Sequence, residues 1–587
     1  MASAKADKAD LYSISTRHSE PISHEATHIS KHNTRKRQMK GHTLISPRLI
    51  YFYALTAFML PNITLCLTEG MPIAACVANV MLPLPIYIWL LSLSVNTGKS
   101  VWFMFPLIFL AAFQMVLLYL FGQGIISVDM FLNVVTSNPG EMAELLDRLL
   151  PAVLGVLAIY IPLLIIAAIA IRRKLQLHTS FLLMAHKATA IMLPFGVGAL
   201  AWTWTTVPAY SPTDHLYPAN VLYNLGLAVV RAHNSATYNE RVADFTFGAR
   251  TSHGDDSTEV YIMVIGETAR ASNFAIYGYS RPTTPRMSSM SGIVAFGRAT
   301  TQSNTTHKSV PMLLSAASAA DYSLLDSQKG IMQAFREAGF TTLFLSNQRR
   351  NHSYIDFLAS QADSCWYAES ENHQKGMDYD NILLPHVRRA LDTCRGRLFI
   401  VLHTYGSHFC YRERYPREFA FFKPDIRDEA KAENREDLIN AYDNTILYTD
   451  YILGEIADML QQSGRTAAMM YTSDHGENIF DDDRNLFLHA SPRPSWYELH
   501  VPLVVWLSEA YSIRHVAQAK ALADNSKKEV ETSRSVFHTM TGIAGISMEA
   551  SDMTANLASP MYREKPRSYL TDHNTQTDAP FNTKCNN

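Results

Sequence analysis

The sequence predicts a membrane-anchored α/β protein, in which five transmembrane helices precede an external domain built on a parallel sheet. Five strongly apolar, uncharged windows lie in the first third of the 587 residues, at 49–68, 70–94, 101–123, 149–171 and 188–208. Each reaches the roughly 20 residues that a helix needs to cross a bilayer. From about residue 258 onward, strand-like apolar runs alternate with helix-like segments, which is typical of α/β domains.

Composition argues against two simpler classes of protein. The chain is too long for one compact domain, and 48% of its residues are hydrophobic. Helices of a soluble core alternate apolar and polar faces, whereas the five windows are apolar all round. A net charge of −2 gives no electrostatic reason to expect a nucleic-acid partner.

The charges between the apolar windows predict the orientation of the chain, because cytoplasmic loops are rich in Lys and Arg. Basic residues gather before the first window, between the second and third, and after the fourth: Arg35, Lys36, Arg37, Lys40, Arg48, Lys99, Arg172, Arg173, Lys174 and Lys187. The remaining connections have an acidic excess: Glu69, Asp129, Glu141, Glu144 and Asp147, against Arg148. With five spans, everything after about residue 209 lies outside the membrane.

These patterns divide the chain into five segments. We expect a disordered cytoplasmic tail (1–46), a five-helix transmembrane domain (47–208, external loop about 124–148), an interfacial helix and linker (209–257), an external α/β domain (258–570) and a disordered tail (571–587). The first tail lacks the apolar core of a cleaved signal peptide, so the first span should remain. Four cysteines lie outside, where oxidation is permitted, and sequence does not choose among their three pairings: Cys365, Cys394, Cys410 and Cys585.

Polar side chains follow several strand-like runs of the external domain. The run at 260–265 leads to Glu267, and the run at 467–471 leads to Asp474 and His475. The run at 398–402 leads to His403 and, a few residues later, to His408. Because ligands collect at the carboxyl ends of strands in doubly wound sheets, we expect Glu267, His408, Asp474 and His475 around one crevice.

A metal ion explains Glu267, Asp474 and His475 better than an acid–base pair does. Carboxylates and imidazole are zinc ligands, and a catalytic zinc site keeps one position for a reacting group. The polar stretch at 300–309 is the best source of that group, since coordination to zinc would favour the alkoxide of a threonine. The same residue types are preferred at helix N-caps, so this stretch taken alone favours an ordinary cap.

Five short motifs together resemble the bacterial phosphoethanolamine transferases of the lipid A and lipopolysaccharide type. They are Val-Ile-Gly-Glu-Thr-Ala-Arg at 264–270, Tyr-Gly-Tyr-Ser-Arg-Pro-Thr-Thr-Pro at 277–285, Thr-Thr-His-Lys-Ser-Val-Pro at 305–311, Gly-Ser-His at 406–408 and Ser-Asp-His-Gly-Glu at 473–477. The resemblance implies five transmembrane helices plus a periplasmic alkaline-phosphatase/sulfatase-like α/β/α domain with a central, mainly parallel sheet. It also implies a multi-pass protein of the bacterial inner membrane, with its catalytic domain in the periplasm.

The resemblance implies a reaction in two halves. Phosphoethanolamine moves from phosphatidylethanolamine onto a zinc-activated threonine and then to a lipopolysaccharide acceptor (lipid A or core) or a periplasmic glycan. The cofactor implied is Zn²⁺, with one ion tightly bound and room for a second, and we expect a monomer.

Carried residue by residue, the resemblance assigns a role to each site position. Glu267, Asp474 and His475 match the zinc ligands, and Thr306 matches both the nucleophile and a further ligand, with Thr305 as its alternative. His408 and His489 match a second histidine pair that binds another zinc ion or the phosphate. The external-loop residues linked to the ethanolamine group are Asn133, Ser137 and Glu141.

The chain departs from the family in two places, and other activities stay open. The family often has Leu-His-Gly where this chain has Leu488-His489-Ala490, and cysteines near the nucleophile are missing here. The alternatives are a phosphoglycerol transferase, a sulfatase or phosphodiesterase-type hydrolase of the same superfamily, and a receptor without enzymatic activity. Sulfatases use a Cys/Ser-x-Pro-x-Arg context, which is absent around Thr306.

Overall fold

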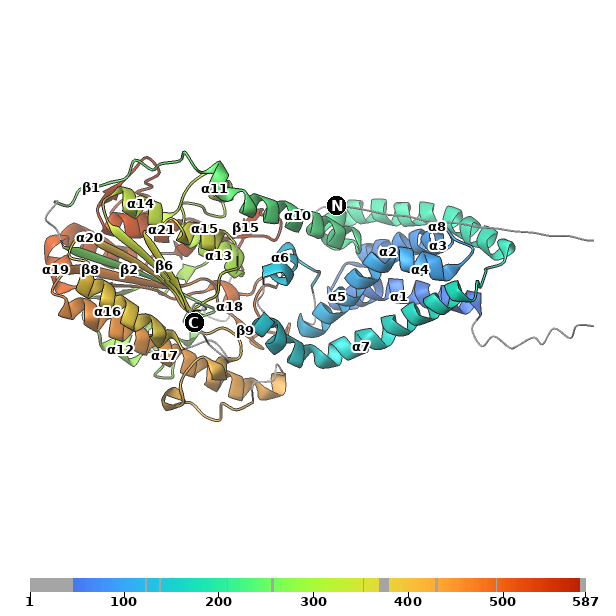
Figure 1. The fold of residues 1–587 in the computed structure, drawn as a ribbon, viewed down its shortest axis with the longest axis horizontal. Coiled ribbons are helices and arrows are strands. Elements are labelled where there is room, and N and C mark those ends of the chain that lie inside the picture. Colours follow the sequence, from blue (N-terminus) through green and yellow to red (C-terminus); the bar gives the residue numbers. More distant parts are fainter. Residues whose placement is uncertain are drawn as a thin grey trace, which may run out of the picture. The chain divides into compact units, whose positions relative to one another are not determined.

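The computed structural model of the chain describes residues 46–121, 124–136, 139–207, 210–254, 258–351, 353–368, 379–427, 431–491 and 493–580. The N-terminal part is helical (Figure 1), with the elements α1 (Pro47–Thr68), α2 (Ile73–Met81), α3 (Pro83–Leu91), α4 (Thr97–Phe103), α5 (Phe105–Phe121), α6 (Val128–Thr136), α7 (Pro139–Arg172) and α8 (Thr179–Thr206).

The apolar helices correspond to the five predicted windows. Four stretches are long and apolar enough to cross a membrane, namely α1, Ile73–Leu91, Leu150–Arg172 and α8. Helices α4 and α5 meet at 65° and bring the number to five within the described residues if the bent pair is one span. Helix α8 begins at Thr179, before the predicted window at 188–208, and it contains Lys187. The predicted window stops short of this lysine because it admits no charged residue, whereas a helix tolerates one.

The segment between the apolar helices and the catalytic domain is partly built into that domain. It contains α9 (Pro212–His215), α10 (Ala219–Ala236), α11 (Tyr238–Arg241) and strand β1 (Arg250–Thr251). Tyr238, Val242 and Phe247 are buried in the core of the catalytic domain, and β1 pairs with β13 (Ile546–Ser547). The second half of the segment predicted as an interfacial helix and linker (209–257) is therefore packed on the catalytic domain, because a few widely spaced apolar residues are enough to attach it.

A seven-stranded sheet forms the centre of the catalytic domain, in the order β3-β11-β8-β2-β7-β5-β6. Its strands are β2 (Glu259–Gly266), β3 (Ile293–Ala295), β5 (Thr341–Ser346), β6 (Ser364–Tyr367), β7 (Leu398–His403), β8 (Thr466–Ser473) and β11 (Leu503–Leu507). Strands β8, β2, β7, β5 and β6 are parallel, and β11 runs antiparallel to β8 and β3. The fold class is thus the mainly parallel α/β sheet that the sequence predicts.

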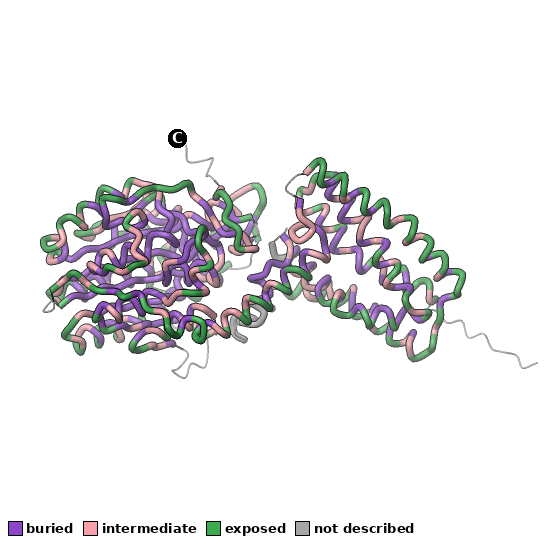
Figure 2. Tube along the Cα trace, turned by 90° about the horizontal axis from the view of Figure 1, so that it is seen from above, coloured by how far each residue is buried: buried purple, intermediate pink, exposed green. Residues whose placement is uncertain are grey.

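Two helical layers enclose the sheet, because side chains of a strand alternate between its faces. Tyr261, Met263 and Ile265 of β2 join one hydrophobic cluster, and Val260, Ile262 and Val264 join the other. Figure 2 shows the resulting buried interior, and Figure 1 shows the helices above and below the strands. These helices are α12 (Pro285–Ser289), α13 (Thr306–Leu313), α14 (Ile331–Glu337), α15 (Tyr354–Ala359), α16 (Leu384–Thr393), α17 (Arg435–Gln462), α19 (Glu509–Arg514), α20 (Val516–Asn525) and α21 (Thr532–Ile543).

The C-terminal segment is more ordered than its composition suggests. Strand β14 (Ser568–Leu570) pairs with β15 (Gln576–Asp578), although 571–587 was expected to be disordered. Polar composition hides this order, which comes from backbone pairing and from Asp572, whose carboxylate accepts a hydrogen bond from the Val128 amide. Residues 581–587, including Cys585, lie outside the described residues, and within the described residues Cys365 and Cys394 are free thiols.

Candidate functional site

Three neighbouring parallel strands bring the predicted site residues together. Glu267 follows β2, Asp474 and His475 follow β8, and His408 lies in the loop after β7. Because β2 pairs with both β7 and β8, their carboxyl ends share one edge of the sheet. Thr306, the first residue of α13, reaches the same point, where Glu267, Asp474 and His475 are buried.

Four side-chain atoms converge on one small volume. The Thr306 hydroxyl oxygen lies 3.1 Å from Nε2 of His475 and donates a hydrogen bond of 3.3 Å to Oε1 of Glu267. The same Nε2 lies 3.5 Å from that Glu267 oxygen and 3.2 Å from Oδ2 of Asp474. Three oxygens therefore surround one imidazole nitrogen.

The spacing of these atoms fits a tetrahedrally bound zinc ion. Zinc bonds of about 2.0–2.1 Å place neighbouring ligand atoms about 3.3 Å apart, which is the middle of the observed range. Oδ2 of Asp474 is buried and accepts no hydrogen bond within the described part of the chain. A buried carboxylate oxygen without a donor is costly unless a cation compensates it. The donor set of Glu267, Asp474, His475 and Thr306 therefore fits a divalent metal ion.

Neighbouring groups fix the orientation of the Glu267 and His475 side chains. Glu267 accepts hydrogen bonds from the Thr268 hydroxyl at 2.8 Å and from Nε2 of Gln348 at 3.1 Å. Nδ1 of His475 lies 2.9 Å from the Gly476 carbonyl oxygen, so this nitrogen carries the proton and Nε2 presents its lone pair. Gln348 follows β5, and sequence reasoning did not assign it to the site.

The backbone at the edge of the sheet is tightly packed and locally strained. Thr268 adopts a left-handed conformation with φ of 63°, and its amide donates to Oδ1 of Asp474 at 3.0 Å. Gly406 has φ of 52°, and a Cβ atom there would lie 2.8 Å from the Glu267 backbone. A glycine is therefore required in the Gly-Ser-His motif, because it lets the loop after β7 approach Glu267.

The electrostatics of the centre indicate a shortage of positive charge. Burial and the nearby Asp474 carboxylate raise the pKa of Glu267. Burial alone would lower the pKa of His475, but the carboxylates of Asp474 and Glu267 outweigh it and the net shift is upward. Both shifts mean that the site favours an added positive charge, whether a proton or a metal ion.

His408 and His489 lie beside this centre as neutral imidazoles. Burial lowers the pKa of His408 to about 4 and the pKa of His489 well below its ordinary value. The rings of His489 and His475 are 4.1 Å apart, and Nδ1 of His489 lies 3.2 Å from Oε1 of Glu477. Nδ1 of His408 is buried and has no hydrogen-bond partner among the described residues. A neutral imidazole can bind a metal ion or donate one hydrogen bond to a phosphate oxygen.

Ala490 occupies a conformation that suits glycine, which gives a stability prediction. Its φ is 64°, in the left-handed region, where a side chain costs about 1 kcal/mol. Ala490→Gly should therefore stabilise the protein by about 0.5–1 kcal/mol, measured as a higher thermal unfolding midpoint. Ala338→Gly is the matched control, because its φ of −78° is ordinary and the same change should lower the midpoint. Equal shifts in both variants would refute the assignment of strain to Ala490.

Thr305, the alternative to Thr306, contacts a different part of the structure. The Thr305 hydroxyl donates to Oδ2 of Asp129 at 3.1 Å, and Asp129 also pairs with Lys308 and Arg231. Thr305 therefore contacts α6, while Thr306 contacts Glu267 and His475. Ser137 and the side chains of Asn133 and Glu141 lie outside the described residues.

Comparisons with known proteins connect this geometry to characterised relatives. The profile of the family described as Sulfatase matches residues 259–546. Phosphoethanolamine transferase EptA from Escherichia coli (strain K12) is 27% identical over 517 residues, which cover 81% of this chain and 87% of that protein.

Solved structures share the fold of this chain. The integral membrane protein lipooligosaccharide phosphoethanolamine transferase A (EptA) from Neisseria meningitidis has a TM-score of 0.71 at 22% identity, covering 87% of this chain and 98% of its own. The C-terminal periplasmic domain of EcEptC from Escherichia coli, solved as a complex with Zn, has a TM-score of 0.51 at 23% identity and covers 56% and 94%. The first of these likenesses extends over the apolar helices as well as the sheet.

Proposed function

Because the chain belongs to the bacterial phosphoethanolamine transferase family of sulfatase-like proteins, we propose that it transfers phosphoethanolamine from phosphatidylethanolamine to a lipopolysaccharide or periplasmic glycan acceptor. The transfer passes through a covalent intermediate on Thr306. The observation that carries this proposal is the convergence of the Thr306 hydroxyl with Glu267, Asp474 and His475.

Glu267, Asp474, His475 and Thr306 are the residues that hold a zinc ion in this proposal. When bound, zinc supplies a Lewis acid that favours loss of the hydroxyl proton and neutralises charge on phosphate oxygens. The support from this chain is its donor set, the buried Oδ2 of Asp474 and the spacing of about 3.3 Å between ligand atoms.

The proposed reaction consists of two successive substitutions at phosphorus. In the first step the Thr306 oxygen forms a bond to phosphorus, the phosphorus–glycerol oxygen bond breaks, and diacylglycerol leaves with the proton that Thr306 loses. In the second step an acceptor oxygen forms a bond to the same phosphorus, the bond between phosphorus and the Thr306 oxygen breaks, and Thr306 takes up the proton that the acceptor loses. The position of Thr306 at the N-terminus of α13 also directs backbone amides toward the phosphate.

The remaining predicted residues take supporting roles in this proposal. His408 and His489 hold the phosphate or a second metal ion, which their neutral, buried imidazoles permit. Asn133, Ser137 and Glu141 bind the ethanolamine group. In this proposal the protein acts as a monomer in the inner membrane, where a lipid donor is confined, with its catalytic domain in the periplasm. The long apolar helices support the membrane location.

The proposal predicts a defined change in the cell envelope. Mass spectrometry of envelope lipids and polysaccharides, with and without this gene product, should find one species that gains a phosphoethanolamine unit. A matched strain producing the Thr306→Ala protein should resemble the strain without the gene product. A gain of phosphoglycerol would favour the phosphoglycerol transferase alternative, and loss of a phosphate or sulfate group would favour a hydrolase.

A further inference from the structure

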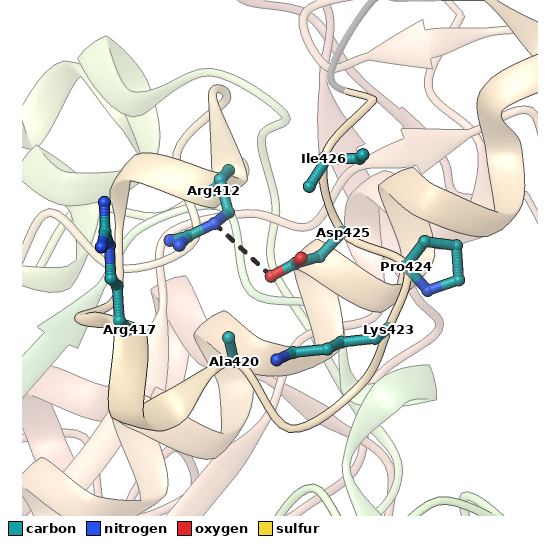
Figure 3. Close-up of a pocket in the computed structure, with 7 residues that line it drawn as sticks. All are labelled: Arg412, Arg417, Ala420, Lys423, Pro424, Asp425 and Ile426. Carbon is teal, nitrogen blue, oxygen red and sulfur yellow. Dashed lines mark ion pairs between the residues drawn. The ribbon is translucent and has the colours of Figure 1, made fainter.

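A cavity lined by charged residues lies in the catalytic domain, in the segment between β7 and α17. It has a volume of about 650 Å³ and is lined by Arg412, Arg417, Lys423, Asp425 and Ile426, among others. Figure 3 shows the three basic side chains arranged around one space, with Asp425 joined to Arg412. Cavities of this size hold small ligands or the headgroups of larger ones.

This basic pocket is lined by three cationic side chains and one carboxylate, and among these described residues the carboxylate pairs with only one of the cations. Asp425 is buried, lies 3.5 Å from Nε of Arg412 and accepts a hydrogen bond of 2.8 Å from the Tyr415 hydroxyl. Arg412 also lies over the Tyr415 ring at 5.0 Å, so this pair is held in place from two sides. Among the residues that the structure describes, no ion pair involves Arg417 or Lys423. Within the described residues, Arg417 and Lys423 therefore line the pocket without an ion-pair partner, which favours an anionic ligand.

Exposed apolar side chains in the loop of the basic pocket indicate that its ligand also has an apolar part. Ile426 lines the cavity and is 77% exposed, and Phe421, from the same loop, is 67% exposed. An apolar side chain as exposed as that of Ile426, in a pocket with the cations of Arg417 and Lys423, favours a ligand that combines an anionic group with apolar chains. A guanidinium and an ammonium group together suit phosphate, which accepts several charge-assisted hydrogen bonds.

The loop that forms the pocket is also connected to the candidate centre. Tyr411, the residue before Arg412, donates a hydrogen bond of 2.6 Å to Oε2 of Glu477. The other oxygen of Glu477 lies 3.2 Å from His489, whose ring is next to His475. A ligand in the pocket is thus held by a segment that is fixed directly to the centre.

We propose that Arg417 and Lys423 bind a phosphate group of the acceptor lipid, while Ile426 and Phe421 contact its apolar part. This inference rests on the proposed function and specifies its acceptor as a phosphorylated amphiphile. Binding energy gained at a distance from the reacting atom raises the rate at low acceptor concentration.

The test uses the full-length protein in detergent micelles and a pair of matched double variants. Arg417→Glu/Lys423→Glu reverses the pocket charges, and Arg389→Glu/Lys527→Glu makes the same change in net charge at two exposed positions elsewhere. Three quantities are measured: formation of the Thr306 adduct from phosphatidylethanolamine alone, the dissociation constant for diphosphoryl lipid A, and its displacement by inorganic phosphate. The pocket variant should bind lipid A about tenfold or more weakly than wild type, yet form the adduct at an unchanged rate.

Several outcomes would overturn the inference. Unchanged lipid A affinity in the pocket variant, or an equal loss in the control variant, would exclude a specific role for the pocket. A parallel loss of adduct formation would assign the loop to the donor or to folding. Inorganic phosphate that binds as tightly as lipid A would make this a site for free phosphate. If wild type forms no adduct at all, the proposed function fails, whereas the binding measurement still decides the role of the pocket.

Discussion

Thr306→Ala is expected to abolish the covalent phosphoethanolamine adduct and to lower transfer by at least about 10⁴-fold. The reason is that the proposed reaction uses the Thr306 hydroxyl as its nucleophile, and this oxygen lies within hydrogen-bond distance of both Glu267 and His475. The measurement is the intact mass of the purified full-length protein after incubation with phosphatidylethanolamine and rapid denaturation. Wild type should gain one phosphoethanolamine unit, and the variant should gain none.

Two further variants make this result specific to the nucleophile. Thr306→Ser keeps the hydroxyl and should retain the adduct at a lower rate. Thr305→Ala removes the neighbouring hydroxyl, which points to Asp129, and should also retain the adduct. An undiminished adduct in Thr306→Ala, or its loss only in Thr305→Ala, would transfer the role to another residue.

Glu267→Gln is expected to remove the metal ion and, with it, about 10³-fold or more of the activity. The carboxylate supplies negative charge that a neutral amide cannot replace, and a metal ion contributes several kcal/mol to stabilising the reacting phosphate. Elemental analysis should find about one zinc ion per wild-type chain and much less in the variant. Activity and metal content should fall together, and added zinc should restore neither at low micromolar concentration.

A matched control exists at the opposite end of β2. His253, Glu259 and His515 form another group of potential ligands, in which Nδ1 of His253 lies 2.8 Å from Glu259. His253→Ala should leave the activity and the activity-linked zinc unchanged. His253 contacts Glu259 at the start of β2, whereas Glu267 follows the end of the same strand, so the two groups are separated by the full length of β2. Full zinc occupancy in Glu267→Gln combined with loss of zinc in His253→Ala would contradict the assignment.

Local patterns in the sequence were sufficient to predict that Glu267, Asp474 and His475 lie close together. Each of these three candidate ligands follows a buried strand, and parallel strands end at one edge of a sheet, which brings the three side chains together. The five apolar windows likewise depend on composition alone, and they correspond to the helices and the bent pair of the structure. The resemblance to the family favours Thr306 over Thr305 by its position in the Thr-Thr-His-Lys-Ser-Val-Pro motif. In the structure Thr306 contacts His475, whereas Thr305 contacts Asp129, which gives this choice a physical basis.

Other features depend on long-range contacts that composition does not reveal. Gln348 reaches Glu267 only because β5 lies beside β7, so its role could not be derived from its own segment. The contribution of Phe247 to the core and the pairing of β15 with β14 order segments that look like a linker and a tail. The left-handed conformation of Ala490 was similarly hidden, although the departure from Leu-His-Gly marked the position.

The most direct test is a crystal structure of the full-length protein grown with zinc, with anomalous data collected above and below the zinc absorption edge. We predict an edge-dependent peak about 2.0–2.2 Å from side-chain atoms of Glu267, Asp474, His475 and Thr306. A zinc peak bound elsewhere, with the Thr306 hydroxyl beyond bonding distance of any metal ion, would contradict the account.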